Sequence, residues 1–196
     1  MSAGKPVLIA CECSQVECSA FRAAGVEAYS CDVLPCRGEH PEWHLQCDVV
    51  DVMRPGKWGM IIAHPPCTYL CAAGAMQMRV GGQLNEERLA KMILARDFFM
   101  MFHRWEDCPI AIENPRPLAI AQLPPYSQII CPSEFGHAWT KRTYLWLKGL
   151  PVLLPTWAKN IKAKQYVAHK HVGYQRSRSF EGIAEAMAAQ WSKYIV

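Results

Sequence analysis

The sequence contains no apolar run that approaches the roughly eighteen residues of a membrane-spanning helix, and Met1–Pro6 lacks the apolar core of a signal peptide. Internal repeats and low-complexity tracts are absent as well. These absences favour a soluble, intracellular, globular protein. With 196 residues and a hydrophobic content of 51%, the chain is long enough to bury one core, and we expect a single domain over residues 1–196.

Paired Cys-x2-Cys motifs are absent, although the chain has ten cysteines. Spacings such as Cys11-x-Cys13 and Cys67-x3-Cys71 do not match zinc knuckles, so we expect no metal site. Disulfides are not expected in a chain without a secretory signal. Most of the cysteines are therefore interpreted as small core residues with reduced thiols.

Asp and Glu are absent between Gly136 and Phe180, and this stretch carries nine of the 21 Lys and Arg residues of a chain whose net charge is only +4. Aromatic and His side chains alternate with these charges. Such a pattern is typical of a surface that contacts phosphates and stacks on bases. We expect the basic segment, defined as residues 155–178, to bind nucleic acid; the alternative is a solvated surface.

Short apolar runs alternate with helical patterns along the chain. Strands are expected at residues 7–11, 27–31, 59–63, 109–113 and 143–147, and helices at 19–25, 85–105 and 180–194. This alternation predicts an α/β fold with a mostly parallel sheet flanked by helices. Ser179 is a candidate N-cap of the last helix. Residues 72–83 contain three glycines and are predicted to form a mobile loop.

Reactive side chains follow two of the apolar runs. The run Ile61–Ala63 leads into His-Pro-Pro-Cys67, and the run Ile110–Ile112 ends in Glu113 and an asparagine. Ligands collect at the carboxyl ends of strands in open α/β sheets, so the thiol is a candidate nucleophile and the carboxyl group a candidate acid. The alternatives are a buried core cysteine and a carboxylate that caps the following turn.

The order of these motifs resembles the catalytic series of the cytosine-C5 DNA methyltransferases: Pro-Pro-Cys, then Glu-Asn, then a basic pair that precedes a strand. The opening segment is similar to the same family, with a strand and turn at 7–14, a short helix at 19–25 and a second strand that ends on Asp32. The resemblance covers most of residues 7–147, and the ending is similar to compact bacteriophage proteins of this type. It implies a Rossmann-like fold and the cofactor S-adenosyl-L-methionine (SAM).

The resemblance also implies residue roles. Cys67 would attack C6 of cytosine, Glu113 would hydrogen-bond N3, and Arg142 would orient the ring through O2, with Lys141 as a substitute for Arg142. Cofactor contacts are expected from Cys11, Glu12, Cys13, Ser14, Asp32, Asp48 and Pro65. Substrate contacts are expected from Pro66, Asn114, Lys141, Arg176 and Arg178.

Two features depart from the family pattern. The first loop, Cys11–Gln15, has no glycine, and only about thirty residues separate Leu147 from the last helix, where the family has a target-recognition domain. We therefore expect a SAM-dependent cytosine-C5 methyltransferase that acts on DNA with little sequence selectivity. The alternatives are C5 modification of a cytosine nucleotide before polymerisation, a catalytically inert nucleic-acid-binding or inhibitory protein with the same fold, and use of a modified SAM.

Overall fold

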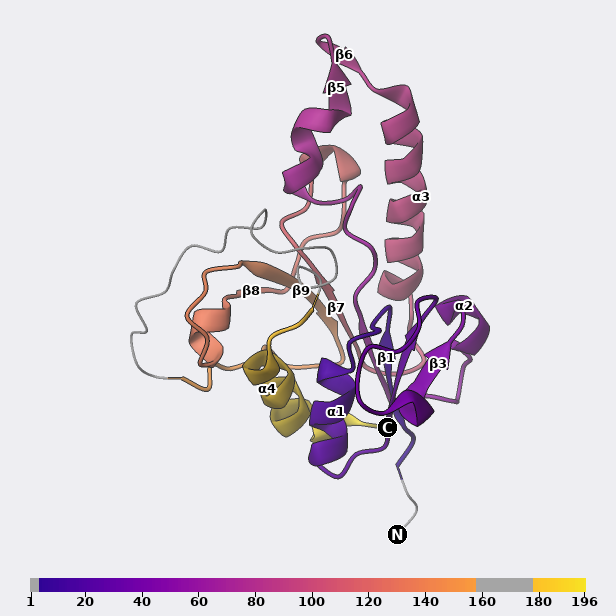
Figure 1. The fold of residues 1–196 in the computed structure, drawn as a ribbon, viewed down its shortest axis with the longest axis vertical. Helices are drawn as coiled ribbons and strands as arrows, with labels where there is room; N and C mark the ends of the chain where they lie inside the picture. Colours follow the sequence, from indigo (N-terminus) through magenta and orange to yellow (C-terminus); the bar gives the residue numbers. More distant parts are fainter. Residues whose placement is uncertain (1–3, 158–177) are drawn as a thin grey trace.

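The computed structural model of the protein describes residues 4–157 and 178–196. Arg176 and most of the basic segment lie outside the described residues. Seven strands form one sheet in the order β3-β2-β1-β4-β7-β9-β8 (Figure 1). Their bounds are β1 Val7–Ala10, β2 Ala28–Asp32, β3 His44–Gln46, β4 Met60–Ala63, β7 Ile110–Asn114, β8 Gln128–Ile130 and β9 Thr143–Lys148.

Strands β3, β2, β1, β4 and β7 are parallel, and β9 runs antiparallel to both β7 and β8. The expected mostly parallel, Rossmann-like sheet is confirmed. Its strand order reverses between β1 and β4, which is where such sheets bind ligands. Because β9 is antiparallel, with Tyr144 opposite Asn114, the residues that precede β9 lie at the same edge as the carboxyl ends of β4 and β7.

Helices cover both faces of the sheet. Helix α1 (Val16–Ala23) packs against α4 (Glu181–Trp191) on one face, whereas α3 (Glu86–His103) lies on the other (Figure 1). The short helices are α2 Val49–Val52 and the 3₁₀ turns η1 Pro41–Trp43, η2 Ala72–Met78, η3 Ala119–Ala121, η4 Pro132–Phe135 and η7 Ser192–Tyr194. None of the described helices is long and apolar enough to cross a membrane.

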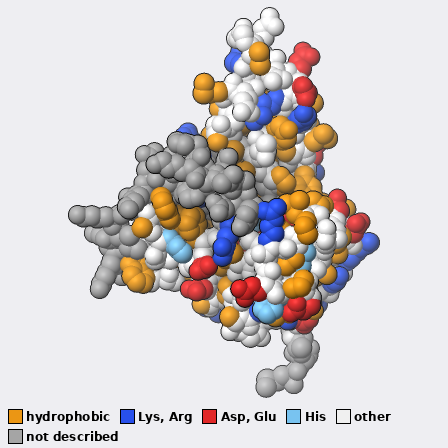
Figure 2. Space-filling model, viewed as in Figure 1, with side chains coloured by type: hydrophobic (Ala, Val, Ile, Leu, Met, Phe, Trp, Pro, Cys, Tyr) orange, Lys and Arg blue, Asp and Glu red, His pale blue; other side chains and the backbone are white. Residues whose placement is uncertain are grey.

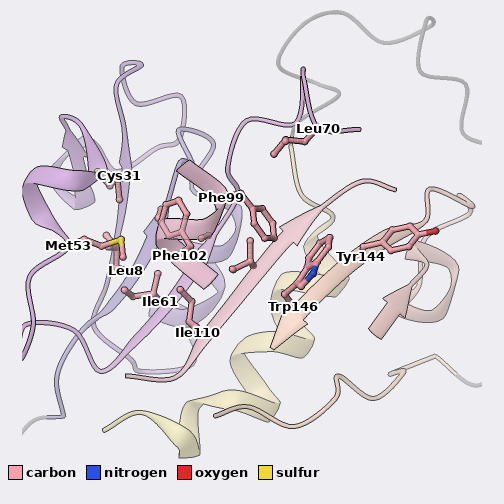
Figure 3. Packing of buried hydrophobic residues seen from close by; sticks show 14 of the residues in the cluster. Leu8, Cys31, Met53, Ile61, Leu70, Phe99, Phe102, Ile110, Tyr144 and Trp146 are labelled. Carbon is pink, nitrogen blue, oxygen red and sulfur yellow. The ribbon is translucent and has the colours of Figure 1, made fainter. Parts of the chain in front are cut away.

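Alternate residues of each strand enter opposite cores, as the two-residue repeat of a β-strand requires. Ile9 belongs to a core with Trp191 of α4, whereas Leu8 belongs to a core with Phe99 of α3. In the second core, Phe99 packs edge-on against Trp146 of β9, with ring centroids 5.0 Å apart (Figure 3). The central strands β1, β4 and β7 are therefore buried on both faces, which explains why they read as continuous apolar runs.

The segment between Cys71 and α3, which was predicted to be a mobile loop over residues 72–83, has regular secondary structure, although most of its residues are exposed. It forms η2 and a hairpin of β5 (Arg79–Val80) and β6 (Gln83–Leu84), in which Gly81 and Gly82 have φ angles of 57° and 83°. Two glycines with positive φ are what a tight two-residue hairpin turn requires. The hairpin projects beside α3, and exposed apolar side chains of this segment include Met76 of η2 and Val80 of β5 (Figures 1 and 2).

The start of α4 also differs from expectation. Phe180 is the N-cap residue and makes no side-chain cap hydrogen bond, so Ser179 does not cap the helix. The Ser179 side chain instead hydrogen-bonds the carboxylate of Glu17 on α1. The tertiary contact between the two helices has therefore displaced the local capping interaction.

Candidate active site

The loop after β4 carries the candidate nucleophile. Pro65 is buried and Pro66 is exposed, and together they turn the chain at the carboxyl edge of the sheet. Cys67 then begins a helical turn, because its carbonyl oxygen accepts hydrogen bonds from the N–H groups of Leu70 and Cys71, both at 3.0 Å. The Cys67 side chain is half-buried at this edge.

A buried hydrogen bond joins this loop to the end of β7. Asn114 has no exposed surface, and its Nδ2 donates to the carbonyl oxygen of Pro65 at 2.9 Å. Glu113 precedes Asn114 and lies close enough to Cys67 for its charge to raise the pKa of that thiol. The hydrogen bond of Asn114, the last residue of β7, thus holds the loop that carries Cys67 beside the strand end that carries Glu113.

Cys67 and Cys71 form a hydrogen-bonded pair of thiols. The hydrogen bond to Cys71 and burial raise the pKa of Cys67 well above its usual range. The same hydrogen bond, together with backbone N–H groups that include those of Ala73 and Gly74, lowers the pKa of Cys71 to about 6 in spite of burial. Within the pair, these effects favour the thiolate form of Cys71 over that of Cys67. Of the two sulfurs, Cys71 is buried and Cys67 is the more accessible.

The basic pair before β9 is divided between two sides, because successive residues of an extended segment point in opposite directions. Lys141 lines a cavity of about 20 Å³ together with Glu113 and Arg178, and its charge also acts on Cys67. Arg142 is exposed, does not line this cavity, and acts electrostatically on Cys131. The structure thus brings Lys141, and not Arg142, to the Cys67–Glu113 pair. Figure 2 shows basic and acidic side chains intermixed in the middle of this face.

Three titratable side chains, His64, Glu17 and Glu12, continue inward from Glu113. His64 Nδ1 lies 3.3 Å from Glu113 Oε2, and His64 Nε2 lies 3.3 Å from Glu17 Oε1. Glu17 in turn contacts Glu12, whose Oε1 accepts hydrogen bonds from Ser14 Oγ at 3.0 Å and from the Glu17 N–H at 3.3 Å. Glu12 and Glu17 are only 5% and 1% exposed.

Sequence reasoning gave no role to His64 or Glu17. The signal for His64 is a polar side chain inside a run that is otherwise apolar from Met60 to Pro65. Glu17 had a weaker signal, since an acid in the first turn of α1 is ordinary helix composition. Their contact joins positions 47 residues apart, and it depends on how α1 packs beside β4.

The glycine-free first loop adopts glycine-like backbone conformations. Cys11 and Gln15 have φ angles of 60° and 62°, in the left-handed region that residues with a side chain rarely occupy. The Gln15 side chain is buried, and its amide both donates to and accepts from the backbone of His40, at 2.7 and 3.1 Å. Positive φ at non-glycine residues is often found at functional sites, where surrounding contacts offset the strain.

Two acids lie at the carboxyl ends of neighbouring strands. Asp32 ends β2, and Asp48 follows β3 and caps α2 through a 3.0 Å hydrogen bond from the N–H of Val50. The Cys11 thiol lies close enough to both acids for their charges to act on it. Burial is the largest cause that raises the pKa of Cys11, and the charges of Asp32 and Asp48 raise it further. Cys13 lies near Asp32 as well. Exposed apolar side chains flank the acids, with Val33 66% and Val50 51% exposed.

Within residues 4–157 and 178–196, no group of three or more His, Cys, Asp and Glu side chains is arranged to hold a metal ion. No protein-family model and no curated protein matches the sequence. Among solved structures, the chain is similar to a triple-substituted variant of DNMT2 from Spodoptera frugiperda, with 12% identity and a TM-score of 0.37. The match covers 83% of this chain and 55% of that one, so this chain spans about half its length. Similarity at this level carries no information on substrate or activity.

Proposed function

We propose that this protein is a SAM-dependent methyltransferase that modifies C5 of cytosine in DNA with little sequence selectivity. The observation that carries the proposal is the juxtaposition of an accessible thiol, Cys67, with a carboxyl group, Glu113, and an ammonium group, Lys141, at the carboxyl edge of the sheet. The buried hydrogen bond between Asn114 and Pro65 supports it, because it holds the thiol loop against the end of β7.

This set of groups suits the chemistry of cytosine. C5 of the base is a poor nucleophile, and addition of the Cys67 sulfur at C6, as its thiol proton passes to Cys71, breaks the aromaticity of the ring and makes C5 reactive. A hydrogen bond or proton from Glu113 at N3 stabilises the charge that develops on the ring. Lys141 is assigned the role of orienting the base through O2, in place of Arg142, because Lys141 lines the same cavity as Glu113.

The residues around Asp32 and Asp48 fit the nucleoside part of SAM, which when bound supplies an electrophilic methyl group. Carboxylates at the ends of neighbouring strands suit ribose hydroxyls and an adenine amino group, and apolar neighbours such as Val33 suit the flat face of a base. Cys11 and Cys13 are assigned to the same pocket. Glu12 and Ser14 are assigned no direct cofactor contact, because the Glu12 carboxyl group is buried against Glu17 and accepts the Ser14 hydroxyl.

DNA is proposed as the substrate from the charge of the basic segment and from Arg178, which is exposed and lines the cavity beside Glu113. If the segment contacts phosphates, the logarithm of affinity falls linearly with the logarithm of salt concentration, and the slope counts the contacts. Changing Lys159, Lys162 and Lys164 to Ala is expected to flatten that slope without weakening SAM binding. DNA binding that does not depend on salt would contradict this assignment.

The test is to incubate the protein with SAM and, in parallel, with cytosine-containing DNA, RNA or deoxycytidine monophosphate, and to weigh the nucleosides by mass spectrometry. We expect 5-methylcytosine in DNA from the unaltered protein and none from Cys67→Ser. DNA that contains 5-fluorocytosine should form a covalent adduct with the unaltered protein alone. Cys108→Ser is the matched control, because Cys108 lies before β7 at the opposite edge of the sheet.

The outcome separates the alternatives. Product only from deoxycytidine monophosphate would replace DNA by a nucleotide as the substrate. Full activity of Cys67→Ser would refute the assignment of the nucleophile. No product in any mixture, together with no SAM binding, would favour an inert nucleic-acid-binding protein.

A further inference from the structure

His64 connects the proposed acid to the interior of the protein. Its imidazole is 11% exposed and lies between two carboxyl groups, with Nδ1 3.3 Å from Glu113 and Nε2 3.3 Å from Glu17. The backbone keeps the ring in place, because the His64 N–H donates to the Ala10 carbonyl oxygen at 2.9 Å and so extends the pairing of β4 with β1. A histidine whose Nδ1 is hydrogen-bonded to one carboxyl group, and whose Nε2 lies at ion-pair distance from another, is suited to supply a proton to the first.

The charges around His64 favour the imidazolium form. Burial would lower the pKa of His64, but the charge of Glu17 and the hydrogen bonds to Glu113 and Glu17 raise it well above its usual range. Lys141 before β9 and Arg178 before α4 line the same cavity and oppose this effect. The two carboxylates are the groups in contact with the ring, so their effect is the larger one.

Glu12 keeps Glu17 ionised. Burial and the neighbouring charge of Glu17 raise the pKa of Glu12 well above its usual range, so this carboxyl group holds its proton and hydrogen-bonds Glu17. For Glu17, burial acts in the opposite direction, but the charge of His64 and hydrogen bonds from His64, Glu12 and Ser179 lower its pKa to about 2. A permanent negative charge therefore faces His64 from the side away from Glu113.

We propose that His64 is a positioning residue that supplies protons to Glu113, and that Glu17, supported by Glu12, keeps His64 charged for this purpose. The inference rests on the function proposed above, in which Glu113 gives a hydrogen bond or proton to N3 of the base.

Each proton in this step has a destination. As the Cys67 sulfur adds to C6, its thiol proton passes to Cys71, whose thiol has the lower pKa of the two. The Nδ1 proton of His64 moves to the Glu113 carboxylate, Glu113 passes a proton to N3, and His64 becomes a neutral imidazole that keeps the proton on Nε2, 3.3 Å from Glu17. After C5 has taken the methyl group, C5 loses its proton to solvent, Cys67 leaves C6 and takes its proton back from Cys71, and the N3 proton returns through Glu113 to His64. No oxidant is needed.

The protonation state of His64 can be measured without any assay of activity. In two-bond ¹H–¹⁵N spectra of the labelled protein, we expect both ring nitrogens of His64 to stay protonated at pH values above the usual range of histidine. Glu17→Gln keeps the shape of the side chain and removes its charge, and it should move the His64 titration down by about one pH unit or more. His64→Gln identifies the signals.

Glu42→Gln is the matched control. Glu42 contacts His40 Nδ1 at 3.1 Å in an exposed pair far along the chain from this site, so the change should affect the signals of His40 and leave those of His64 unchanged. A neutral His64 at pH 7 in the unaltered protein, or a titration that Glu17→Gln does not move, would overturn the proposal.

Kinetics test the use of the proton. His64→Gln should lower kcat by about tenfold, less than removal of a group that acts directly on the base, and leave the KM for DNA unchanged. Glu17→Gln should shift the alkaline limb of the kcat profile to lower pH, which loss of structure alone would not do. An unchanged kcat profile in both variants refutes the proton supply. No methyl transfer by the unaltered protein refutes the proposed function instead, and the spectra still decide whether His64 holds the proton.

Discussion

Replacement of Glu12 by Gln should change how the stability of this protein depends on pH. In the folded chain, burial and the charge of Glu17 raise the Glu12 pKa well above 4.5, so the carboxyl group keeps its proton. In the unfolded chain, the same group ionises above about pH 4.5. Above that pH the folded state binds one more proton than the unfolded state, and the free energy of unfolding therefore falls as pH rises.

The magnitude follows from the one proton involved. Each pH unit above 4.5 costs about 1.4 kcal/mol, or about 3 kcal/mol between pH 4.5 and 6.5. Glu17 does not make the free energy of unfolding depend on pH in this window. Its pKa is about 2 in the folded chain and about 4.5 in the unfolded chain, so its contribution changes only between these two values. His64 does not contribute to the pH dependence in this window either. Because its pKa is raised in the folded chain, the stability that it contributes is lost only as pH rises above its usual value of 6.5. The window between 4.5 and 6.5 thus isolates Glu12 from its two partners.

Glu12→Gln places a neutral amide where the protonated carboxyl group lies. Its oxygen can accept from Ser14 and from the Glu17 N–H, and its amide N–H can donate to the Glu17 carboxylate. We expect the variant to match the unaltered protein near pH 4.5 and to be about 3 kcal/mol more stable at pH 6.5. Urea unfolding at pH 4.5, 5.5 and 6.5 measures the difference. Glu185→Gln, an exposed change on α4, should leave the slope unaltered. Parallel curves for Glu12→Gln and the unaltered protein would refute the reasoning.

Three further predictions concern other parts of the structure. Asp32→Ala should weaken SAM binding by about 1–3 kcal/mol in calorimetry, the usual cost of a lost charged hydrogen bond, while the melting temperature stays close to that of the unaltered protein. Asn114→Ala should lower the free energy of unfolding by about 1–3 kcal/mol, because the buried Pro65 carbonyl oxygen loses its donor; equal stability would show that another donor replaces it. Gly182→Ala should destabilise the fold or prevent its formation, since the added Cβ would overlap the Phe135 carbonyl oxygen, and circular dichroism would detect this loss.

Local signals were enough to predict the long buried strands. Three apolar runs, at residues 7–11, 59–63 and 109–113, were each predicted to be a strand, and the bounds of each observed strand agree to within one residue. The first run ends at a cysteine, the second at a His-Pro-Pro turn and the third at an Asn-Pro pair. Side chains that follow such strands must lie at one edge of a parallel sheet, so Cys67 and Glu113 could be predicted to lie at the same edge without coordinates. The sequence therefore determined the fold class, the central strands and the nature of the thiol and carboxyl groups.

Short elements and the direction of β9 depended on tertiary pairing. Strands β3 and β8 have three residues each and were missed, because so few residues give no periodic signal. Nothing in residues 143–148 encodes an antiparallel direction, yet that direction brings Lys141 to the edge where Glu113 lies.

The chain of Glu12, Glu17, His64 and Glu113 was decided by tertiary structure alone. Each of these residues has an ordinary local explanation, as a loop acid, a first-turn acid, a strand-end histidine and a strand-end acid. Their pKa shifts arise only when α1 packs beside β4 and removes water from the carboxyl groups, because burial and neighbouring charge act over a few ångströms whatever the separation along the chain. The sequence by itself determined which reactive groups this protein possesses, and the packing of the helices on the sheet decided which of them hold a proton.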